Sequence, residues 1–453
     1  MMSRGGARAA LGAVSAACLL SACSEEETLE GERQGLRDGR GTIAAPVEIG
    51  PGGEVRGAEA AAPEDTSFAA PPPVAPESWP QTRGGPAHHI PHLAFDGALD
   101  PVWRVDIGAG NDRRHRIAAA PVVAGGRIAA MDARSHVSAV SPGGELLWQT
   151  DLTPPGERNA DASGGGVAAG GGRLYASTGF GTVAALDPET GAVLWVQETG
   201  AGVTAAPAYR DGIVYAVARD DTAWAIRADD GRVLWQLSGT PAPAGFLGGA
   251  SPAVTDRQAL LPFASNEVVG ALAKGGVRLW SSGVAGRREG RVYARYDDIS
   301  GDPVVAGGTV FFGTQSGRTV ALDAADGTRR WTADEGAYSP VWVAGNSVFL
   351  ISDAGALVRL DRGSGAVIWR RDLPHFTRET PGKRSDVETN FGPVLAGGRL
   401  IVASGDGRFR LFDPGDGSPL GTRPIGGGAA ADPIVAGGTL YLVTSGGRLA
   451  AFR

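Results

Sequence analysis

Ala185-Leu-Asp-Pro-Glu-Thr-Gly-Ala-Val-Leu-Trp195 is the stretch that decides the fold, because it recurs along the chain. Related stretches are Ala225-Ile-Arg-Ala-Asp-Asp-Gly-Arg-Val-Leu-Trp235, Ala321-Leu-Asp-Ala-Ala-Asp-Gly-Thr-Arg-Arg-Trp331 and Arg359-Leu-Asp-Arg-Gly-Ser-Gly-Ala-Val-Ile-Trp369. A second shared element lies upstream, as in Pro303-Val-Val-Ala-Gly-Gly-Thr309. Self-similarity of this kind is the signature of a repeat architecture.

Each copy of the repeat predicts four short antiparallel strands. An apolar strand follows the Pro, a Gly-Gly hairpin leads to the second strand, and another Gly-containing turn leads to the third. Asp-x-x-x-Gly then supplies the turn to a fourth strand that ends at Trp, because the Asp side chain caps the turn and the Gly takes a positive φ. One such unit cannot bury both of its faces, so the units must pack on one another, and closing them into a ring removes the exposed ends.

Eight positions end a repeat. Seven of them are tryptophans, and in a degenerate eighth copy the Trp is replaced by Gly421. The tryptophans, whose large rings we expect to pack between neighbouring blades, are Trp103, Trp148, Trp195, Trp235, Trp280, Trp331 and Trp369. The sequence therefore predicts an all-β fold, an eight-bladed β-propeller of four-stranded antiparallel blades.

The two ends of the repeat region complement each other. The last copy stops at Ala451-Phe-Arg453, just before its turn and Trp strand, and the missing piece stands near the other end, in residues 96–103. We therefore expect the N-terminal strand to complete the last blade and close the ring.

The start of the chain resembles an export signal. Arg4 and Arg8 precede an apolar run from Ala9 to Leu20, and Leu20-Ser-Ala-Cys23 looks like a lipobox. The sequence predicts a lipoprotein signal peptide over residues 1–22 and acylation of Cys23 with palmitate-like chains; an ordinary signal peptide with a chance Cys is the alternative. Ser24, in place of the Asp that retains lipoproteins at the inner membrane, favours the periplasmic face of the outer membrane.

The rest of the chain divides into two parts. Residues 23–78 lack hydrophobic periodicity and are rich in acidic, Pro and Ala residues, so we expect a flexible stalk. Residues 79–453 form the predicted propeller. No later run is apolar enough for a transmembrane helix, so the expected membrane attachment is the lipid anchor alone.

Composition and charge exclude several functions. Removing residues 1–22, which carry two Arg and no acid, moves the net charge from −7 to −9, so nucleic-acid binding is not expected. The two cysteines, Cys18 and Cys23, leave no thiol for a disulfide or a metal site. His88, His89 and His92 are close together, but Gly and Pro flank them, and we expect an exposed loop rather than a metal site. We therefore expect no metal, no cofactor and no catalytic residue.

The Trp-ended repeats resemble those of the pyrroloquinoline quinone dehydrogenases, which are eight-bladed. That resemblance implies a calcium site, an Asp base and a vicinal Cys pair, and the mature chain cannot form that pair. The innermost strands are preceded by small residues, as in residues 118–121 and 205–207, which offer few functional groups to a central site. A quinoprotein enzyme is therefore the alternative, and not the leading hypothesis.

The combination of lipobox, stalk, Trp79-Pro-Gln opening and repeats resembles the BamB family of outer-membrane assembly lipoproteins. The resemblance implies a non-enzymatic scaffold of the β-barrel assembly (Bam) complex. Its expected partners are a periplasmic POTRA domain of BamA, other Bam components and unfolded outer-membrane proteins. A periplasmic sensor or binding propeller is a third hypothesis.

The resemblance also implies a docking site on two neighbouring blades. The family's Leu-Arg-Gly segment aligns with Phe246-Leu247-Gly248, where the Arg is absent, and its Asp-x-Asp aligns with Asp298-Ile299-Ser300, where one Asp is kept. Arg295 and Asp297 precede the second segment, and Asp297 is a candidate to replace the missing Asp. The implied partner-binding residues are Phe246, Leu247, Gly248, Arg295, Asp297 and Asp298. For Asp297 and Asp298 a solvated turn is the alternative.

Overall fold

The computed structural model describes residues 66–241, 249–284, 288, 299–378, 380 and 386–453. It also gives the backbone of two short antiparallel strands, β1 (Glu48–Ile49) and β2 (Val55–Arg56). Among these residues there is no helix with the length and apolar character that crossing a bilayer requires.

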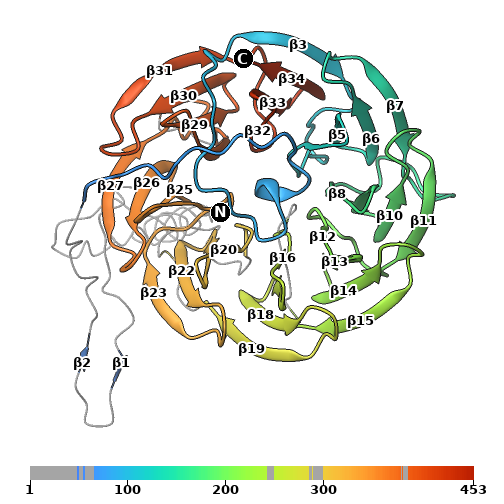
Figure 1. The fold of residues 1–453 in the computed structure, drawn as a ribbon, viewed down its shortest axis with the longest axis horizontal. Coiled ribbons are helices and arrows are strands. Elements are labelled where there is room, and N and C mark those ends of the chain that lie inside the picture. The colour runs from blue at the N-terminus through green and yellow to red at the C-terminus, as the bar shows by residue number, and fades with distance from the viewer. Residues whose placement is uncertain are drawn as a thin grey trace, which may run out of the picture. The chain divides into compact units, whose positions relative to one another are not determined.

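Eight four-stranded antiparallel sheets form a ring, as Figure 1 shows, and confirm the predicted propeller. We number the sheets as blades 1 to 8 from β4 onward. Blades 1 to 4 consist of β4 (Val122–Ala124), β5 (Arg127–Met131), β6 (His136–Val140), β7 (Leu146–Asp151); β8 (Gly165–Gly170), β9 (Arg173–Thr178), β10 (Thr182–Leu186), β11 (Val193–Glu198); β12 (Ala208–Arg210), β13 (Ile213–Val217), β14 (Thr222–Arg227), β15 (Val233–Ser238); and β16 (Ala253–Val254), β17 (Gln258–Pro262), β18 (Glu267–Leu272), β19 (Arg278–Gly283). Blades 5 to 8 consist of β20 (Val304–Ala306), β21 (Thr309–Thr314), β22 (Arg318–Asp323), β23 (Arg329–Ala333); β24 (Trp342–Ala344), β25 (Ser347–Ile351), β26 (Ala356–Asp361), β27 (Val367–Asp372); β28 (Asn390–Ala396), β29 (Arg399–Ser404), β30 (Arg408–Phe412), β31 (Pro419–Pro424); and β32 (Ile434–Ala436), β33 (Thr439–Thr444), β34 (Arg448–Phe452), β3 (Pro101–Asp106).

The strands differ in burial according to their place in the blade. The middle strands β10, β21 and β33 are buried on both faces, because each blade lies between two others. The outer strands β7, β11 and β15 alternate between exposed and half-buried side chains. This is why the middle strands read as nearly continuous runs of small and apolar residues in the sequence.

The ring closes as predicted, because β3 pairs with β34 in the last blade. Arg104 lies opposite Ala450 and Asp106 opposite Arg448. Beyond the strands, Asp100 and Arg453 exchange two backbone hydrogen bonds of 2.7 and 3.0 Å. The N-terminal strand therefore supplies the fourth strand that the C-terminal blade lacks.

Each tryptophan of the repeat joins its blade to the next one. The indole Nε1–H donates to a carbonyl oxygen in the third-to-fourth-strand turn of the following blade, over 2.9 to 3.3 Å. For Trp195 that acceptor is Ala228, and the ring covers Gly231, whose φ is 76°. A Cβ at Gly231 would lie 2.8 Å from the ring. The turn glycine is therefore required both by its backbone conformation and by the indole above it.

The degenerate copy at Gly421 has a structural explanation. Gly421 lies on β31 of blade 7, where a Trp would cover the third-to-fourth-strand turn of blade 8. In blade 8 that turn does not exist, because β34 and β3 come from the two ends of the repeat region. A tryptophan at Gly421 would have no turn to cover.

The antiparallel order gives the ring two different faces. The turn face carries the turns between first and second strands and between third and fourth strands. The loop face carries the other turns and the connections from each blade to the next. The innermost strands therefore run from the loop face to the turn face in every blade.

The hub segment, residues 74–93, lies across the middle of the ring, as Figure 1 shows, and bonds to every blade. Eight of its partners, one in each blade, lie toward the turn-face ends of the innermost strands, so the segment closes that end of the central channel. In chain order of the hub segment they are Gly437, Val123, Ala169, Tyr209, Val254, Val305, Val343 and Leu395, one in each of blades 8 and 1 to 7. The segment therefore makes one circuit of the ring in blade order.

The prediction of an exposed loop at His88, His89 and His92 is wrong, because all three lie in the hub segment. His88 is buried and its Nδ1 bonds to the carbonyl oxygen of Pro303 over 2.9 Å. His92 is also buried, between the carbonyl oxygen of Pro71 and the amide of Gly398. Burial lowers the pKa of His88 to about 4, so this imidazole is neutral and structural at physiological pH.

The last residues assigned to the stalk also pack on the ring. Arg359, fully buried on β26, donates to the carbonyl oxygens of Thr66 and Ser67 over 2.8 Å each. Phe68 meets the edge of Phe349 with ring centroids 5.4 Å apart. Chain packed against the propeller therefore begins upstream of the predicted boundary at residue 79.

Candidate functional site

A cavity of about 650 Å³ lies at the loop-face end of the central channel. Its walls come from the small residues that precede the innermost strands, such as Ala118, Ala119 and Ala206. Thr82 of the hub segment also lines it. The hub segment closes the other end of the channel, so among the described residues the cavity faces the loop face.

The predicted partner-binding residues, at positions 246–248, 295, 297 and 298, lie outside the described residues. Their described neighbours lie together. Gly249 and Ser251, which follow the first segment, line the cavity, and so do Ile299 and Ser300, which follow the second. The residues that follow the two segments therefore meet at the same cavity on the loop face.

Arg288, between the two described ends of the blade 4 to blade 5 connection, is tied to the loop face. Its guanidinium contacts both carboxylate oxygens of Asp353, at 2.7 and 2.9 Å, and donates to Glu335 over 3.2 Å. Glu335 also pairs with Arg370. Because Asp353 is fully buried, this two-point ion pair holds Arg288 against the loop-face residues of blades 5 and 6.

Two carboxylates at the cavity, one buried and one half-buried, were not found by sequence reasoning. Asp302 and Asp432 each precede a Pro at the start of an innermost strand, in blades 5 and 8. Each accepts a backbone N–H from the preceding blade, Asp302 from Ser251 over 2.7 Å and Asp432 from Gly392 over 2.6 Å. The signal available in the sequence was Asp-Pro in two repeats where others have Ala-Pro, Ser-Pro or Gly-Pro.

The two carboxylates differ in their charged neighbours. Arg83 of the hub segment lies 3.6 Å from Oδ2 of Asp432 and stacks on Trp342, 5.0 Å from the ring centroid. Ser339 donates to the other oxygen of Asp432. Burial raises the pKa of Asp302 to about 7 and the charge of Asp432 adds to this, while the Ser251 N–H and the charge of Arg83 act in the opposite direction.

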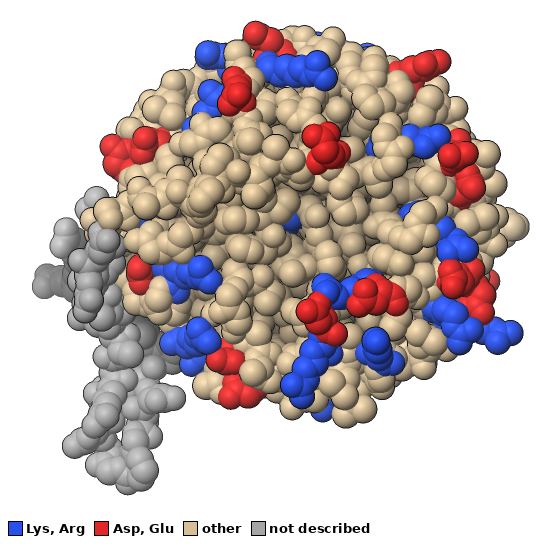
Figure 2. Space-filling model, viewed as in Figure 1, with Lys and Arg blue, Asp and Glu red and all other residues tan. Residues whose placement is uncertain are grey.

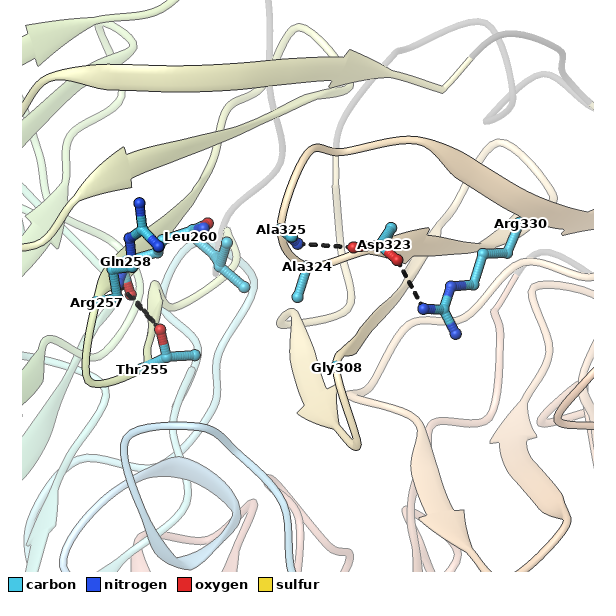
Figure 3. A pocket seen from close by; sticks show the side chains of 9 residues that line it. All are labelled: Thr255, Arg257, Gln258, Leu260, Gly308, Asp323, Ala324, Ala325 and Arg330. Atoms are coloured by element: carbon cyan, nitrogen blue, oxygen red, sulfur yellow. Dashed lines mark hydrogen bonds and ion pairs between the residues drawn. The ribbon is translucent and has the colours of Figure 1, made fainter.

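A second, smaller hollow of about 380 Å³ lies between blades 4 and 5 (Figure 3). Its polar groups already have partners inside the protein. Asp323 pairs with Arg330 over 2.7 Å, and Gln258 accepts from the indole of Trp280 over 3.1 Å. The hollow is therefore the seam beneath a tryptophan contact between two blades.

The charges on the face drawn in Figure 2 lie around its outer part, with both signs mixed, while the middle is formed by other residues. Such a face exerts no uniform field on a polyanion.

The described residues do not fit the calcium and quinone site that the dehydrogenase resemblance implies. They contain no group of three or more His, Cys, Asp and Glu side chains that could hold a metal ion. Both cysteines of the chain lie outside them.

Known proteins similar to this chain agree on one family. The model of the family described as outer membrane protein assembly factor BamB matches residues 133–371 and 376–453. The chain is 24% identical to outer membrane protein assembly factor BamB of Yersinia pestis over 371 residues, which cover 80% of this chain and 91% of that protein. It is 26% identical to the protein of the same name from Alteromonas naphthalenivorans, over 52% of this chain and 59% of that protein.

Solved structures show the same fold. The crystal structure of BamB from Moraxella catarrhalis matches with a TM-score of 0.63 at 19% identity, over 79% of this chain and 100% of that one. The quinohemoprotein alcohol dehydrogenase from Comamonas testosteroni matches with a TM-score of 0.65 at 15% identity, over 83% and 80% of the two chains. At these identities the structures show the propeller alone. The sequence match decides between the BamB family and the quinohemoprotein dehydrogenases. The chain belongs to the family of outer membrane protein assembly factor BamB.

Proposed function

We propose that this protein is a non-enzymatic scaffold of the β-barrel assembly machinery, which docks its loop face on a periplasmic POTRA domain of BamA and aids the folding and insertion of outer-membrane proteins. Family membership supports the complex. The observation that carries the docking face is the common cavity bordered by Gly249, Ser251, Ile299 and Ser300. It brings the ends of the two candidate docking segments to one place.

The proposal includes attachment to the periplasmic face of the outer membrane through acylated Cys23. The lipobox supports the anchor, and the names of the relatives support the membrane. Cys23 itself lies outside the described residues.

A quinoprotein enzyme shares the propeller but gains no support from the site. Alanines form part of the cavity wall, and the described His, Cys, Asp and Glu side chains do not gather into a metal site. We therefore propose a scaffold, and not a dehydrogenase.

The docking proposal is tested by co-purification with BamA. The double variant Asp298→Arg, Leu247→Glu is expected to reduce BamA recovery at least tenfold, because reversing a charge in an interface costs several kcal/mol. Crosslinking in intact cells identifies the partner that the wild-type protein contacts.

The matched control is Asp229→Arg with Leu194→Glu, the same two changes at exposed positions on the turn face and on outer strand β11. This variant is expected to keep wild-type recovery. If the Asp298→Arg, Leu247→Glu variant also kept wild-type recovery of BamA, with equal thermal melts, the two docking segments would be solvated turns and not an interface.

A further inference from the structure

Asp302 and Asp432 occupy the same position in two repeats, and only one of them is neutralised. Both precede the Pro of an innermost strand, and both accept the backbone N–H of the residue that precedes the corresponding Pro in the blade before. At Asp432 the second oxygen, Oδ2, meets the guanidinium of Arg83. The hub segment thus supplies a cation to one of two equivalent carboxylates.

The second oxygen of Asp302 has no hydrogen-bond partner among the described residues. The side chain is 8% exposed and lines the cavity, which alanines and other apolar residues line together with polar ones. A buried carboxylate without a partner is unfavourable, and a cation placed against it removes that penalty. The other charged groups lining the cavity are Asp432, which has Arg83, and Glu388 and Arg116.

The cavity has room for more than an ion. Its volume of about 650 Å³ lies within the range of small-ligand sites. Alanine methyls, Ile299, Phe391 and Tyr338 line it, and aromatic faces attract guanidinium and ammonium groups. A ligand with an apolar stem and a cationic end would place the stem against these side chains and the cation against the carboxylate.

We propose that the loop-face cavity is a binding site for a guanidinium or alkylammonium group on an apolar stem, which pairs with Asp302 as Arg83 pairs with Asp432. The group comes either from an Arg or Lys side chain of an inserted polypeptide or from a free polyamine. The site goes beyond the scaffold function, since it requires no second Bam protein.

The test uses the full mature lipoprotein in a non-ionic detergent and two matched probes, N-acetyl-arginine amide and its uncharged isostere N-acetyl-citrulline amide. Calorimetric titration is expected to show saturable binding of the arginine probe and at least tenfold weaker binding of the citrulline probe. Spermidine, titrated separately and in competition, distinguishes the two sources: stronger binding than the arginine probe assigns free polyamines, and weaker binding assigns a peptide side chain.

Variants locate the site. Asp302→Asn keeps an acceptor for the Ser251 amide and is expected to lower affinity for the arginine probe at least tenfold. Ala118→Leu fills part of the cavity without a change of charge and is also expected to lower the affinity for the arginine probe. The control is Asp323→Asn, which alters another Asp of blade 5 that accepts a backbone N–H, on the turn face.

Equal binding of the arginine and citrulline probes would overturn the proposal, and so would Asp302→Asn binding like the wild type. Absence of saturable binding up to on the order of 10 mM probe, above any useful affinity, would do the same. Because no BamA is present, none of these results bears on the docking proposal.

Discussion

The glycine beneath each indole gives the clearest energetic test of the blade junction. Gly231 and Gly172 both have φ of 76°, but a Cβ would strike Trp195 at Gly231 and nothing within 4 Å at Gly172. Gly172→Ala is expected to lower the free energy of unfolding by about 1–2 kcal/mol, the cost of a left-handed alanine. Gly231→Ala is expected to lower it by about 2–5 kcal/mol, because overpacking adds to that cost. Denaturant unfolding measures both.

If both variants lost the same free energy of unfolding, the Trp195 ring would have moved aside at no energetic cost. The junction would then not depend on the close contact between Trp195 and the turn.

Asp302 makes stability depend on pH in a direction opposite to most carboxylates. Its folded pKa of about 7 exceeds the value of about 3.9 for an unfolded Asp, so the folded state binds the proton more tightly. The stabilisation is complete below about pH 4 and is lost as the pH rises to about 7. The Asp302→Asn variant has no carboxyl group to ionise at this position and does not lose this stabilisation. The difference in free energy of unfolding, variant minus wild type, is therefore expected to increase between pH 4 and 7.

The measurement is the difference between the two proteins, because the lowered pKa of His88 acts in the opposite direction over part of this range. The groups around Asp302 are Asp432 and Arg83, and both remain in the variant. A difference that stays constant from pH 4 to 8 would mean that Asp302 ionises alike in the folded and unfolded chain.

At the scale of single residues, the sequence predicts what repeats and misses what does not. The turn Asp, the turn Gly and the Trp recur, so their roles could be inferred from one another. Asp432 and Arg83 both depart from the pattern, and they come together only because the hub segment crosses the ring. Nothing local in either stretch indicates that contact.

At the scale of elements, the strand that closes the ring is a testable dependence. Deleting residues 79–103 removes the first half of β3 and most of the hub segment, and leaves part of β34 as an exposed edge. This variant is expected to melt at least 10 °C below the wild type or to fail to fold.

The matched deletion removes residues 24–65, which precede the contacts of Thr66 and Ser67 with Arg359. It is expected to melt within about 2 °C of the wild type, the scale of a small change in a large domain. Equal melting of the two deletions would mean that another segment closes the ring.

The elements themselves followed from the repeat, whereas the hub segment did not. Each blade has its turns, its alternating outer strand and its apolar middle strands within one copy. The hub segment has no copy elsewhere, and its partners are backbone groups spread over eight blades. Backbone hydrogen bonds of this kind leave no periodic pattern in side chains, so the histidines were assigned to an exposed loop.

For the molecule as a whole, attachment to the membrane is expected to depend on one sulfur atom. Cys23→Ser is expected to move the protein from the membrane fraction to the soluble fraction, provided that the signal peptide is still cleaved. Cys18→Ser is the control, since it changes the other cysteine within the predicted signal peptide and should leave the protein in the membrane. Fractionation and intact mass, which reports the acyl chains, measure both.

If the wild-type protein carried no acyl mass, or was found in the soluble fraction after detergent-free lysis, the first residues would be an ordinary signal peptide.

Repeat proteins normally unfold unit by unit, because each unit touches only its neighbours. In this ring the hub segment is a common partner of blades that do not touch one another. It bonds, for example, to Val123 in blade 1 and to Val305 in blade 5. Opening one blade therefore weakens the hold of the hub segment on all the others. We expect cooperative loss of the ring in a single transition, with amides of β10 and β26, on different sides of it, exchanging with solvent at one shared free energy of opening.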